Sequence, residues 1–450
     1  MTFKIMFFFT FVSLQLLAEN SVCYYYKAHQ NPELDRFGTS EGGWVYGKNL
    51  QGHFEDGFFV VHETSEQVKT SCLNSIHREK GSEYKLLKIT VGNRLGESSL
   101  AYSDSQARII IFGDSLSDDG NVQRATAGLY PKWPYFMGRF SNGPIWTDYL
   151  FMTTNMGILN WAYGGGVAAN RESTANPVKI VEHWITGNLT QYVDKYIRST
   201  KQNQLIAPDE DIFIIWLGAN DFANAHNPRK VVESVEQSIL KLSKVGAKKF
   251  LVIDQFDFLQ SPHEWIESSL KLDYDYDIKA YKKAFDYGNG VKSYIKLSAG
   301  SWEEEKINYR KNQVFENNPV VRYLNSISEG LKTLGEKTRL NVAYLDLFLA
   351  HNKIIGNEYP SLSSNHAVFF DYELQNKKNR CFAGDYDTGS KNPKSDTCSE
   401  LKRSFFYDSS HPTTYAHCWI SLFIDEALFN AGYNHKKPSI QNYDKMCKQQ

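Results

Sequence analysis

Residues 108–118 read RIIIFGDSLSD, and this stretch decides the fold. Its first half, Ile109 to Phe112, is a continuous apolar run, which is typical of a strand buried on both faces. Further apolar runs of this kind occur at 158–162, 212–217, 250–253 and 342–345. Apolar residues at helical spacing occur at 231–242, 321–334 and 413–429. Strands that alternate with helices predict an α/β fold, here a three-layer α/β/α domain with a central parallel sheet.

Polar residues follow three of the predicted strands at their carboxyl ends, where parallel sheets bind ligands. Ser115 comes directly after the first strand, at a point where we expect a helix to begin. The glycines 164–166 follow the second strand and Asn220 follows the third. A serine there can act as a nucleophile, glycines let backbone N–H groups approach a ligand, and an Asn amide can donate to an oxyanion. Taken singly, each also has a structural explanation as a helix cap or a turn.

A further polar group lies near the C-terminus, where Asp408 precedes His411 by three residues. An Asp at this spacing can accept a hydrogen bond from one ring nitrogen, which leaves the other nitrogen to take a proton from a serine. An isolated pair of this kind is more often part of a surface turn. Because all these groups fall at predicted strand or helix boundaries, nucleophilic catalysis is the favoured interpretation.

Four blocks of the sequence resemble those of the GDSL-type, or SGNH, lipases and esterases. The blocks are Gly113–Asp118, the glycines after Asn160, Gly218–Asp221, and Asp408 with His411. The match extends through Asp119–Asn121, Trp133–Tyr135 and Gly138–Trp146, and there it is similar to a secreted bacterial branch of phospholipases A, lysophospholipases and glycerophospholipid–cholesterol acyltransferases. The resemblance covers about 107–262 and 320–430. The segment before it is similar, more loosely, to that of the thermolabile haemolysins.

The resemblance implies an SGNH-hydrolase domain in which Ser115 is the nucleophile, His411 the base and Asp408 the residue that orients the base. It also implies an oxyanion hole made of the Ser115 backbone N–H, one glycine N–H and the Asn220 side chain. We assign the glycine to Gly165, with a one-residue ambiguity within the triple glycine. Such an enzyme needs no cofactor, forms an acyl-enzyme, and passes the acyl group to water or to a hydroxyl acceptor such as cholesterol.

The N-terminus predicts export. Lys4 precedes an apolar run, 5–18, that is too short to span a membrane and has the length of a signal-peptide core. We therefore expect residues 1–18 to be removed and the mature protein to be secreted. All six cysteines follow the predicted cut, and an even number in an exported chain predicts disulfides, although some could be buried thiols. The most local pairing scheme joins Cys23 to Cys72, Cys381 to Cys398 and Cys418 to Cys447.

Two regions stand apart along the exported chain. Residues 19–105 contain apolar runs at 57–61 and 84–91 and no long helical period, which predicts a small β-rich N-terminal module. The polar stretch 97–106 is the expected linker to a hydrolase domain over 106–450.

That domain carries two insertions, a Tyr- and Lys-rich segment at 263–318 and a polar loop at 381–398 bracketed by cysteines. The loop looks like one that restrains some secreted acyltransferases until it is nicked, and exposed loop tips are preferred protease sites. We therefore expect it to cover part of the active-site cleft and to be cut by an activating protease.

Composition excludes several classes of function. Lys plus Arg number 50 and Asp plus Glu number 51, so the chain lacks the basic footprint of a nucleic-acid binder. No C-x-x-C spacing occurs, and the acidic stretch 273–277 lacks the glycine and the final Glu of a calcium loop, so we predict no metal site. Aromatic residues make up 14% of the chain and can fill a core or grip a lipid surface.

These observations favour a secreted serine lipid acyl-hydrolase that acts on phospholipid or lysophospholipid, with cholesterol or another hydroxyl as a second acceptor and transient contact with a membrane. Two alternatives stay open. One is a carbohydrate or short-chain ester esterase on the same fold. The other is a membrane-lytic protein that acts without catalysis, which the aromatic content motivates.

Overall fold

The computed structural model describes residues 19–27, 42–50, 52–55, 58–61, 65–90, 99–101, 107–126, 128–132, 134–154, 156–170, 183, 185–202, 209–224, 226–256, 319–347, 350–351, 381–382, 404–434 and 436–448. Several sequence predictions fall outside these residues. They are the signal peptide at 1–18, the acidic stretch at 273–277, the insertion at 263–318, and most of the loop at 381–398, including Cys398.

The main domain is built on a six-stranded sheet in the order β11-β10-β9-β7-β8-β6. Its strands are β6 (Ser99–Ala101), β7 (Arg108–Gly113), β8 (Gly157–Asn160), β9 (Ile212–Trp216), β10 (Lys249–Ile253) and β11 (Val342–Leu345). All pair in parallel except β6, which runs antiparallel to β8. The apolar run of β7 is fully buried, as expected of a central parallel strand with helices on both faces. The predicted α/β fold is confirmed.

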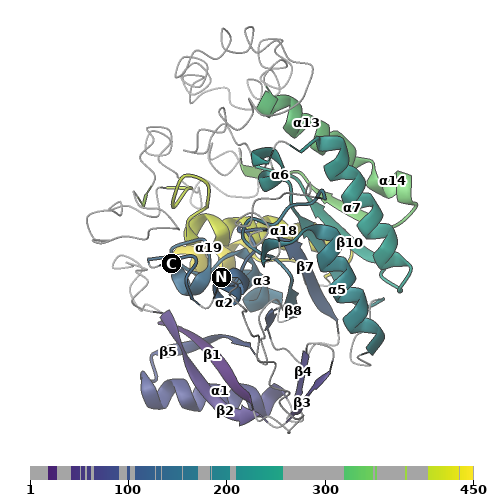
Figure 1. Cartoon of the computed structure of the whole chain (residues 1–450). Coiled ribbons are helices and arrows are strands. Elements are labelled where there is room, and N and C mark those ends of the chain that lie inside the picture. The colour runs from purple at the N-terminus through teal and green to yellow at the C-terminus, as the bar shows by residue number, and fades with distance from the viewer. Residues whose placement is uncertain are drawn as a thin grey trace, which may run out of the picture.

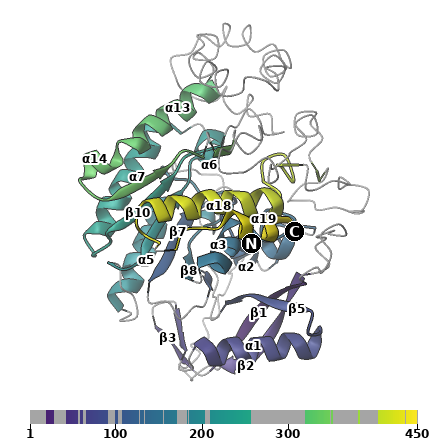
Figure 2. The same ribbon diagram turned by 180° about the vertical axis from the view of Figure 1, so that it is seen from behind.

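Helices cover both faces of the sheet. One group comprises α5 (Leu189–Gln202), α7 (Pro228–Ser243), α13 (Pro319–Lys332) and α14 (Leu334–Thr338), and it lies together in Figure 1. The opposite group comprises α3 (Trp146–Thr154), α18 (Thr414–Asn430) and α19 (Ile440–Lys448), and Figure 2 shows α18 in front of the sheet. Within the first group, the start of α7 is marked in the sequence: Asn227 is its N-cap and Pro228 occupies its first turn.

The N-terminal module has its own antiparallel sheet in the order β2-β1-β5 and a separate hairpin. The strands are β1 (Glu19–Lys27), β2 (Gly42–Leu50), β3 (Gly52–Glu55), β4 (Phe58–Val61) and β5 (Tyr84–Thr90). The module also contains a 15-residue helix, α1 (Ser65–Glu79), which the sequence analysis missed. Val68, Cys72 and Ile76 are buried and form a narrow apolar stripe. Because the residues between them are mostly polar, the helical spacing is hard to recognise in the sequence.

Two of the three disulfides of the most local scheme are present. Cys23–Cys72 joins β1 to α1, and Cys418–Cys447 joins α18 to α19. Cys381 is also disulfide-bonded, and its predicted partner lies outside the described residues. All four cysteines are fully buried: Cys23 and Cys72 belong to the small core of the N-terminal module, and Cys418 and Cys447 belong to the large core of the main domain.

The expected linker at 97–106 is wrong in part, because residues 99–101 form β6 at the edge of the main sheet. Three residues are too short a run for a strand to be recognised from its pattern. The described aromatic residues mainly fill the core, and among the described residues Leu129 is the large apolar side chain that stands out as exposed. Among the described helices, none is long and apolar enough to cross a membrane.

Candidate active site

The loops after three adjacent strands meet at the carboxyl edge of the sheet. Strand β7 pairs with β8 on one side and with β9 on the other. The turn with Ser115 follows β7, the glycine block follows β8, and Asn220 follows β9. The topology therefore brings together the groups that the sequence analysis placed at strand ends.

Ser115 lies in a tight turn. The expected helix does not begin there. The Ser117 N–H donates to the Asp114 carbonyl at 3.0 Å, and the Leu116 N–H donates to Asp114 Oδ1 at 3.0 Å. The next helix, α2 (Asn121–Ala125), starts six residues later. The Asp114 side chain accepts from the Leu116 N–H, and this local bond favours a turn in place of a helix. Ser115 is half-buried in this turn.

Asp118 connects this turn to the glycine block. Its carboxylate accepts hydrogen bonds from the N–H groups of Gly120 and Asn121 at 2.8 and 2.6 Å. The other carboxylate oxygen accepts from the Gly164 N–H at 2.8 Å. Gly165 follows with a φ of +81°, a left-handed conformation that favours glycine. One buried carboxylate thus holds the loop after β7 against the loop after β8.

Asn220 lies in the first turn of the short helix α6 (Ala219–Ala223) and faces the same glycine block. Its side-chain amide donates to the Gly166 carbonyl at 3.0 Å. An amide nitrogen carries two hydrogens, so the second remains for another acceptor. The neighbouring Asp221 accepts from the N–H groups of Ala168 and Ala169 at 2.7 and 2.9 Å. The loop after β8 is therefore fixed from both sides.

Asp408, His411 and Ser115 form a continuous hydrogen-bonded chain. His411 Nδ1 lies 2.7 Å from Asp408 Oδ2, and His411 Nε2 lies 2.9 Å from Ser115 Oγ. The backbone N–H groups of Ser410 and His411 each donate to Asp408 Oδ1 at 2.8 Å. Burial raises the pKa of Asp408, but the charge of His411 and the hydrogen bonds outweigh burial and hold the pKa below its usual value.

Because an ionised carboxylate can only accept, His411 Nδ1 donates to Asp408, and Nε2 is left to accept from the Ser115 hydroxyl. This geometry can move a proton from Ser115 to His411.

Two aromatic residues complete the support of Asp408 and His411. The Tyr135 hydroxyl donates to Asp408 Oδ2 at 2.6 Å, and the Phe140 ring lies 5.1 Å from the His411 ring between centroids. Both residues lie within the blocks that match the family, but the sequence pattern alone indicates no role for them. Tyr135 is 273 residues from Asp408 along the chain, and no local pattern marks such a contact.

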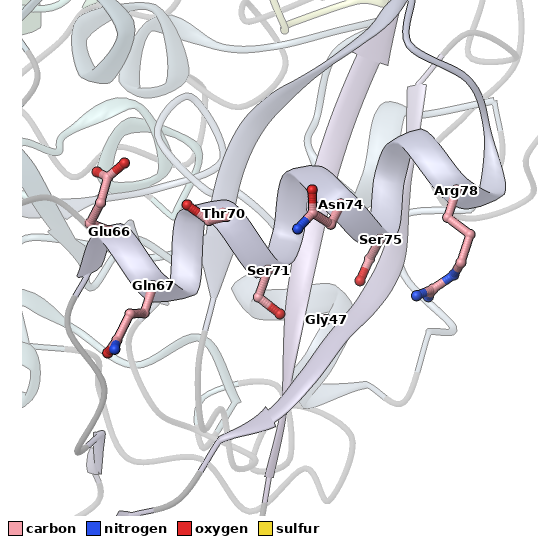
Figure 3. Close-up of a pocket in the computed structure, with 8 residues that line it drawn as sticks. All are labelled: Gly47, Glu66, Gln67, Thr70, Ser71, Asn74, Ser75 and Arg78. Carbon is pink, nitrogen blue, oxygen red and sulfur yellow. The ribbon is translucent and has the colours of Figure 1, made fainter.

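A separate hollow of about 620 Å³ lies in the N-terminal module, between α1 and Gly47 of β2. Figure 3 shows that its lining is polar and comes mainly from one helix, with Thr70, Ser71 and Asn74 along its length. It contains none of the predicted catalytic residues. Among the residues that the structure describes, no group of three or more His, Cys, Asp or Glu side chains is placed to hold a metal.

Comparisons with known proteins bear on this site. A family model described as GDSL-like Lipase/Acylhydrolase matches residues 109–422. The thermolabile hemolysin of Vibrio parahaemolyticus is 23% identical over 400 residues, which cover 84% of this chain and 81% of that protein.

Two other relatives match a shorter part of the chain. The phosphatidylcholine-sterol acyltransferase of Aeromonas hydrophila is 33% identical over 167 residues, 35% of this chain and 46% of that protein. The secreted effector protein SseJ of Salmonella typhimurium is 32% identical over 163 residues, 35% of this chain and 36% of that protein. All three matches agree with the resemblance drawn from the sequence blocks.

Proposed function

Because the chain belongs to the GDSL-like lipase/acylhydrolase family, we propose that it is a secreted serine lipid acyl-hydrolase with acyltransferase activity. Its substrates are phospholipid or lysophospholipid, and its acceptors are water and cholesterol or another hydroxyl. The observation that carries the proposal is the hydrogen-bonded chain from Asp408 through His411 to Ser115. The relatives named as a hemolysin and as a phosphatidylcholine-sterol acyltransferase support the lipid substrate and the sterol acceptor.

The first half of the reaction forms an acyl-enzyme. His411 Nε2 takes the proton of Ser115 as its Oγ attacks the ester carbonyl carbon. The oxyanion forms against the N–H groups of Ser115 and Gly165 and the amide of Asn220. When the ester C–O bond breaks, His411 gives its proton to the leaving oxygen. Losing one donor of such a hole typically costs about 10²–10³ in rate.

The second half of the reaction decides the product. A hydroxyl acceptor enters beside His411, which takes its proton as the acceptor oxygen attacks the acyl carbon. The bond to Ser115 Oγ then breaks, and His411 returns the proton to Oγ. Water as acceptor gives a fatty acid, and a sterol hydroxyl gives a sterol ester. Both products come from the same three residues.

The test is to incubate the purified mature protein with acyl-labelled phosphatidylcholine vesicles that contain cholesterol, and to score fatty acid, lysophospholipid and sterol ester. We expect Ser115→Ala to lose all three products while its circular dichroism spectrum and melting temperature are unchanged. Ser243→Ala is the matched control, because the Ser243 hydroxyl, at the end of α7, donates to the Leu240 carbonyl and has no other hydrogen bond among the residues that the structure describes. That variant should keep full activity.

Other outcomes separate the alternatives. Lysis of vesicles by Ser115→Ala would show that the protein acts physically and would reject catalysis as its function. Cleavage of acetylated sugars or short-chain esters, with no release of long acyl chains, would reject the lipid substrate but retain the catalytic residues.

We also propose a division of the chain into a signal peptide at 1–18, an N-terminal module and a hydrolase domain. The secreted relative SseJ is consistent with export. Because β6 pairs with β8 of the main sheet, we propose that the module ends before Ser99 and not at 105. N-terminal sequencing of the protein recovered from the culture medium should begin at Glu19, and a start at Met1 would reject the signal peptide.

A last proposal concerns the loop at 381–398, of which the structure describes Cys381 and Phe382. The Phe382 N–H donates to the Tyr407 carbonyl at 2.6 Å, and its ring stacks on Tyr407, beside Asp408. The start of the loop therefore lies next to Asp408. We expect a single protease cut between Cys381 and Cys398 to raise sterol-ester formation, and an unchanged rate after complete nicking would reject an inhibitory loop.

A further inference from the structure

Two side chains of the N-terminal module reach the hydrolase domain from its sheet. Lys88 on β5 is 2% exposed and forms an ion pair with Asp119, which is also 2% exposed. Its ammonium group lies 5.6 Å from the centre of the Tyr24 ring on β1. The guanidinium of Arg139 lies 5.8 Å from the same ring. Figures 1 and 2 both show β1 and β5 beside the lower end of the main domain, next to α2.

The partner of Lys88 is directly connected to the oxyanion side of the site. Asp119 follows Asp118, the carboxylate that holds the Gly164 N–H and so orients the glycine block with Gly165. The two aspartates share one turn before α2, and Arg124 lies 3.7 Å from Asp119. A movement of Asp119 therefore moves the group that positions the glycines.

The contact of Tyr24 with Arg139 is connected to the acid–base side of the site. Arg139 is fully buried and holds Asp148 through two hydrogen bonds of 2.6 and 2.7 Å. It also pairs with Asp119 through an isolated backbone bridge. Along the chain, Arg139 lies between Tyr135 and Phe140. Tyr135 donates to Asp408, and Phe140 packs on His411. Tyr24 packs against Phe136 of the same segment.

A buried Lys is costly, and apolar side chains would join two modules at least as well. The charge of Lys88 is directed at a carboxylate that is one residue from the site machinery. We propose that Lys88 and Tyr24 of the N-terminal module are positioning residues for the hydrolase site, and that they act through Asp119 and Arg139 on the loops that hold the oxyanion glycines and the Asp408–His411 pair. This inference rests on the proposed function, because it assigns a role relative to that site.

The electrostatics give the proposal a measurable signature. Burial raises the pKa of Asp118 to about 6, and the charge of Asp119 adds to the rise. The hydrogen bond from the Gly164 N–H and the charge of Arg124 both lower this pKa. Burial also raises the pKa of Asp119, but the charges of Lys88, Arg124 and Arg139 outweigh burial and lower it. Without Lys88, the charge of Asp119 is less neutralised, and Asp118 holds its proton to higher pH. A protonated Asp118 is a weaker acceptor for the Gly164 N–H.

The experiment compares full-length Lys88→Met with wild type on p-nitrophenyl butyrate, with rates expressed per active site titrated by a fluorophosphonate. We expect kcat at pH 7 to fall by roughly tenfold to a hundredfold, the range for misplaced catalytic groups, while KM stays within about twofold. We also expect the acid limb of the kcat/KM profile to move up by about 1 pH unit, the scale of one neighbouring charge. Lys88→Arg should restore most of the kcat and most of the wild-type position of the acid limb.

The matched control is Lys85→Met, which removes an exposed Lys from the same strand and should leave kcat and the pH profile unchanged. If Lys88→Met does not fold, the variant Lys88→Met/Asp119→Asn removes both buried charges. Its acid limb should then return to that of wild type, because the charge of Asp119 no longer acts on Asp118 and protonation of the base His411 still limits the rate.

Two results would overturn the inference. One is wild-type kcat per titrated site with an unmoved acid limb in Lys88→Met, and the other is an acid limb in the double variant that lies as high as in Lys88→Met. Ser115→Ala is measured in parallel. Activity in Ser115→Ala would reject the proposed function, whereas an inactive Ser115→Ala beside a normal Lys88→Met would reject the positioning role alone.

Discussion

At the scale of single residues, the Asp408 carboxylate accepts hydrogen bonds at both oxygens. The Tyr135 hydroxyl and His411 Nδ1 share Oδ2, while two backbone N–H groups share Oδ1. Bonds to a charged group are stronger than those between neutral groups. They keep the carboxylate ionised and fix the direction in which it meets the imidazole.

Removing one of these bonds should reduce catalysis without disturbing the fold. We predict that Tyr135→Phe lowers kcat by about tenfold, or about 1.4 kcal/mol, because Asp408 then holds His411 less firmly. The ring and its contacts with Tyr407 and Phe382 remain. The measurement is kcat and KM on a soluble ester, and KM should not change.

Tyr344→Phe is the control for this change. The Tyr344 hydroxyl donates to Asp254 Oδ2 at 2.7 Å, so the same kind of bond is lost away from Ser115 and His411. Its stability should fall as in Tyr135→Phe, but its kcat should be normal. Equal losses of kcat in both variants would contradict a specific role for Tyr135.

Asp114 predicts a dependence of stability on pH. Burial raises its pKa to about 7 from an ordinary value of 3.8, and Oδ2 has no hydrogen-bond partner among the described residues. Between these values the folded protein holds a proton that the unfolded chain has lost, so this group's contribution falls as pH rises.

Asp114→Asn removes this effect and can still accept from the Leu116 N–H. We predict that the variant gains free energy of unfolding relative to wild type between pH 5 and 7, by about 1.4 kcal/mol per pH unit at most. The difference should level off above pH 8. Urea unfolding at four pH values measures it, and a difference that does not change with pH would show that Asp114 is ionised throughout.

Sequence reasoning reached Ser115, Asp408 and His411 because each lies at a strand or helix boundary and matches a family block. It assigned no role to Tyr135 or Asp118, because their partners are chosen by the folded loops. Asp118 holds Gly164, 46 residues away, and nothing in the local spacing of either residue indicates that bond.

At the scale of elements, the loop after β8 depends on one glycine with a left-handed backbone. A Cβ at Gly165 would lie 3.2 Å from Thr186 Cγ2, and the φ of +81° is unfavourable for any L side chain. We predict that Gly165→Ala costs about 1–2 kcal/mol of stability and lowers kcat by at least about tenfold, because the strained loop moves an oxyanion donor.

Gly432→Ala separates backbone strain from catalysis. Gly432 has a φ of +72° and open space at the Cβ position, and it lies beyond the C-terminal end of α18. Its melting temperature should fall by a similar amount while its kcat is retained. Normal activity in a folded Gly165→Ala would contradict the assignment of this glycine.

The elements that sequence reasoning missed have weak patterns for physical reasons. Helix α1 buries about one apolar residue per turn against the module sheet, so most of its sequence is polar. Strand β6 is recognised only by its pairing with β8, which lies more than 50 residues further along the chain. By contrast, a central strand such as β7 is buried on both faces and reads as a continuous apolar run, and α18 is buried over most of its length.

At the scale of the whole molecule, two disulfides fix two different attachments. Cys418–Cys447 spans 29 residues and fastens α19 to α18, while Cys23–Cys72 spans 49 residues and closes the core of the N-terminal module. In the chain-entropy model, loops of these lengths each stabilise the folded state by roughly 4 kcal/mol. The two bonds should therefore matter similarly for stability.

Their effects on catalysis should differ. His411 is held before α18 by its own contacts, since the Tyr407 N–H donates to the His411 carbonyl at 2.7 Å and the Thr413 N–H to the Phe405 carbonyl at 2.8 Å. We predict that Cys418→Ala/Cys447→Ala melts at a lower temperature but keeps its kcat at 25 °C. Cys23→Ala/Cys72→Ala should lose stability and also kcat, because Tyr24 adjoins Cys23 and packs against Arg139.

The comparison is made per titrated active site at a temperature where both variants are folded, as judged by circular dichroism. Normal kcat in Cys23→Ala/Cys72→Ala would mean that the module's internal order is irrelevant to the site. A loss of kcat in Cys418→Ala/Cys447→Ala would mean that the disulfide, and not the turn before α18, holds His411. A protein whose N-terminal module helps to position its hydrolase site should show the first loss without the second.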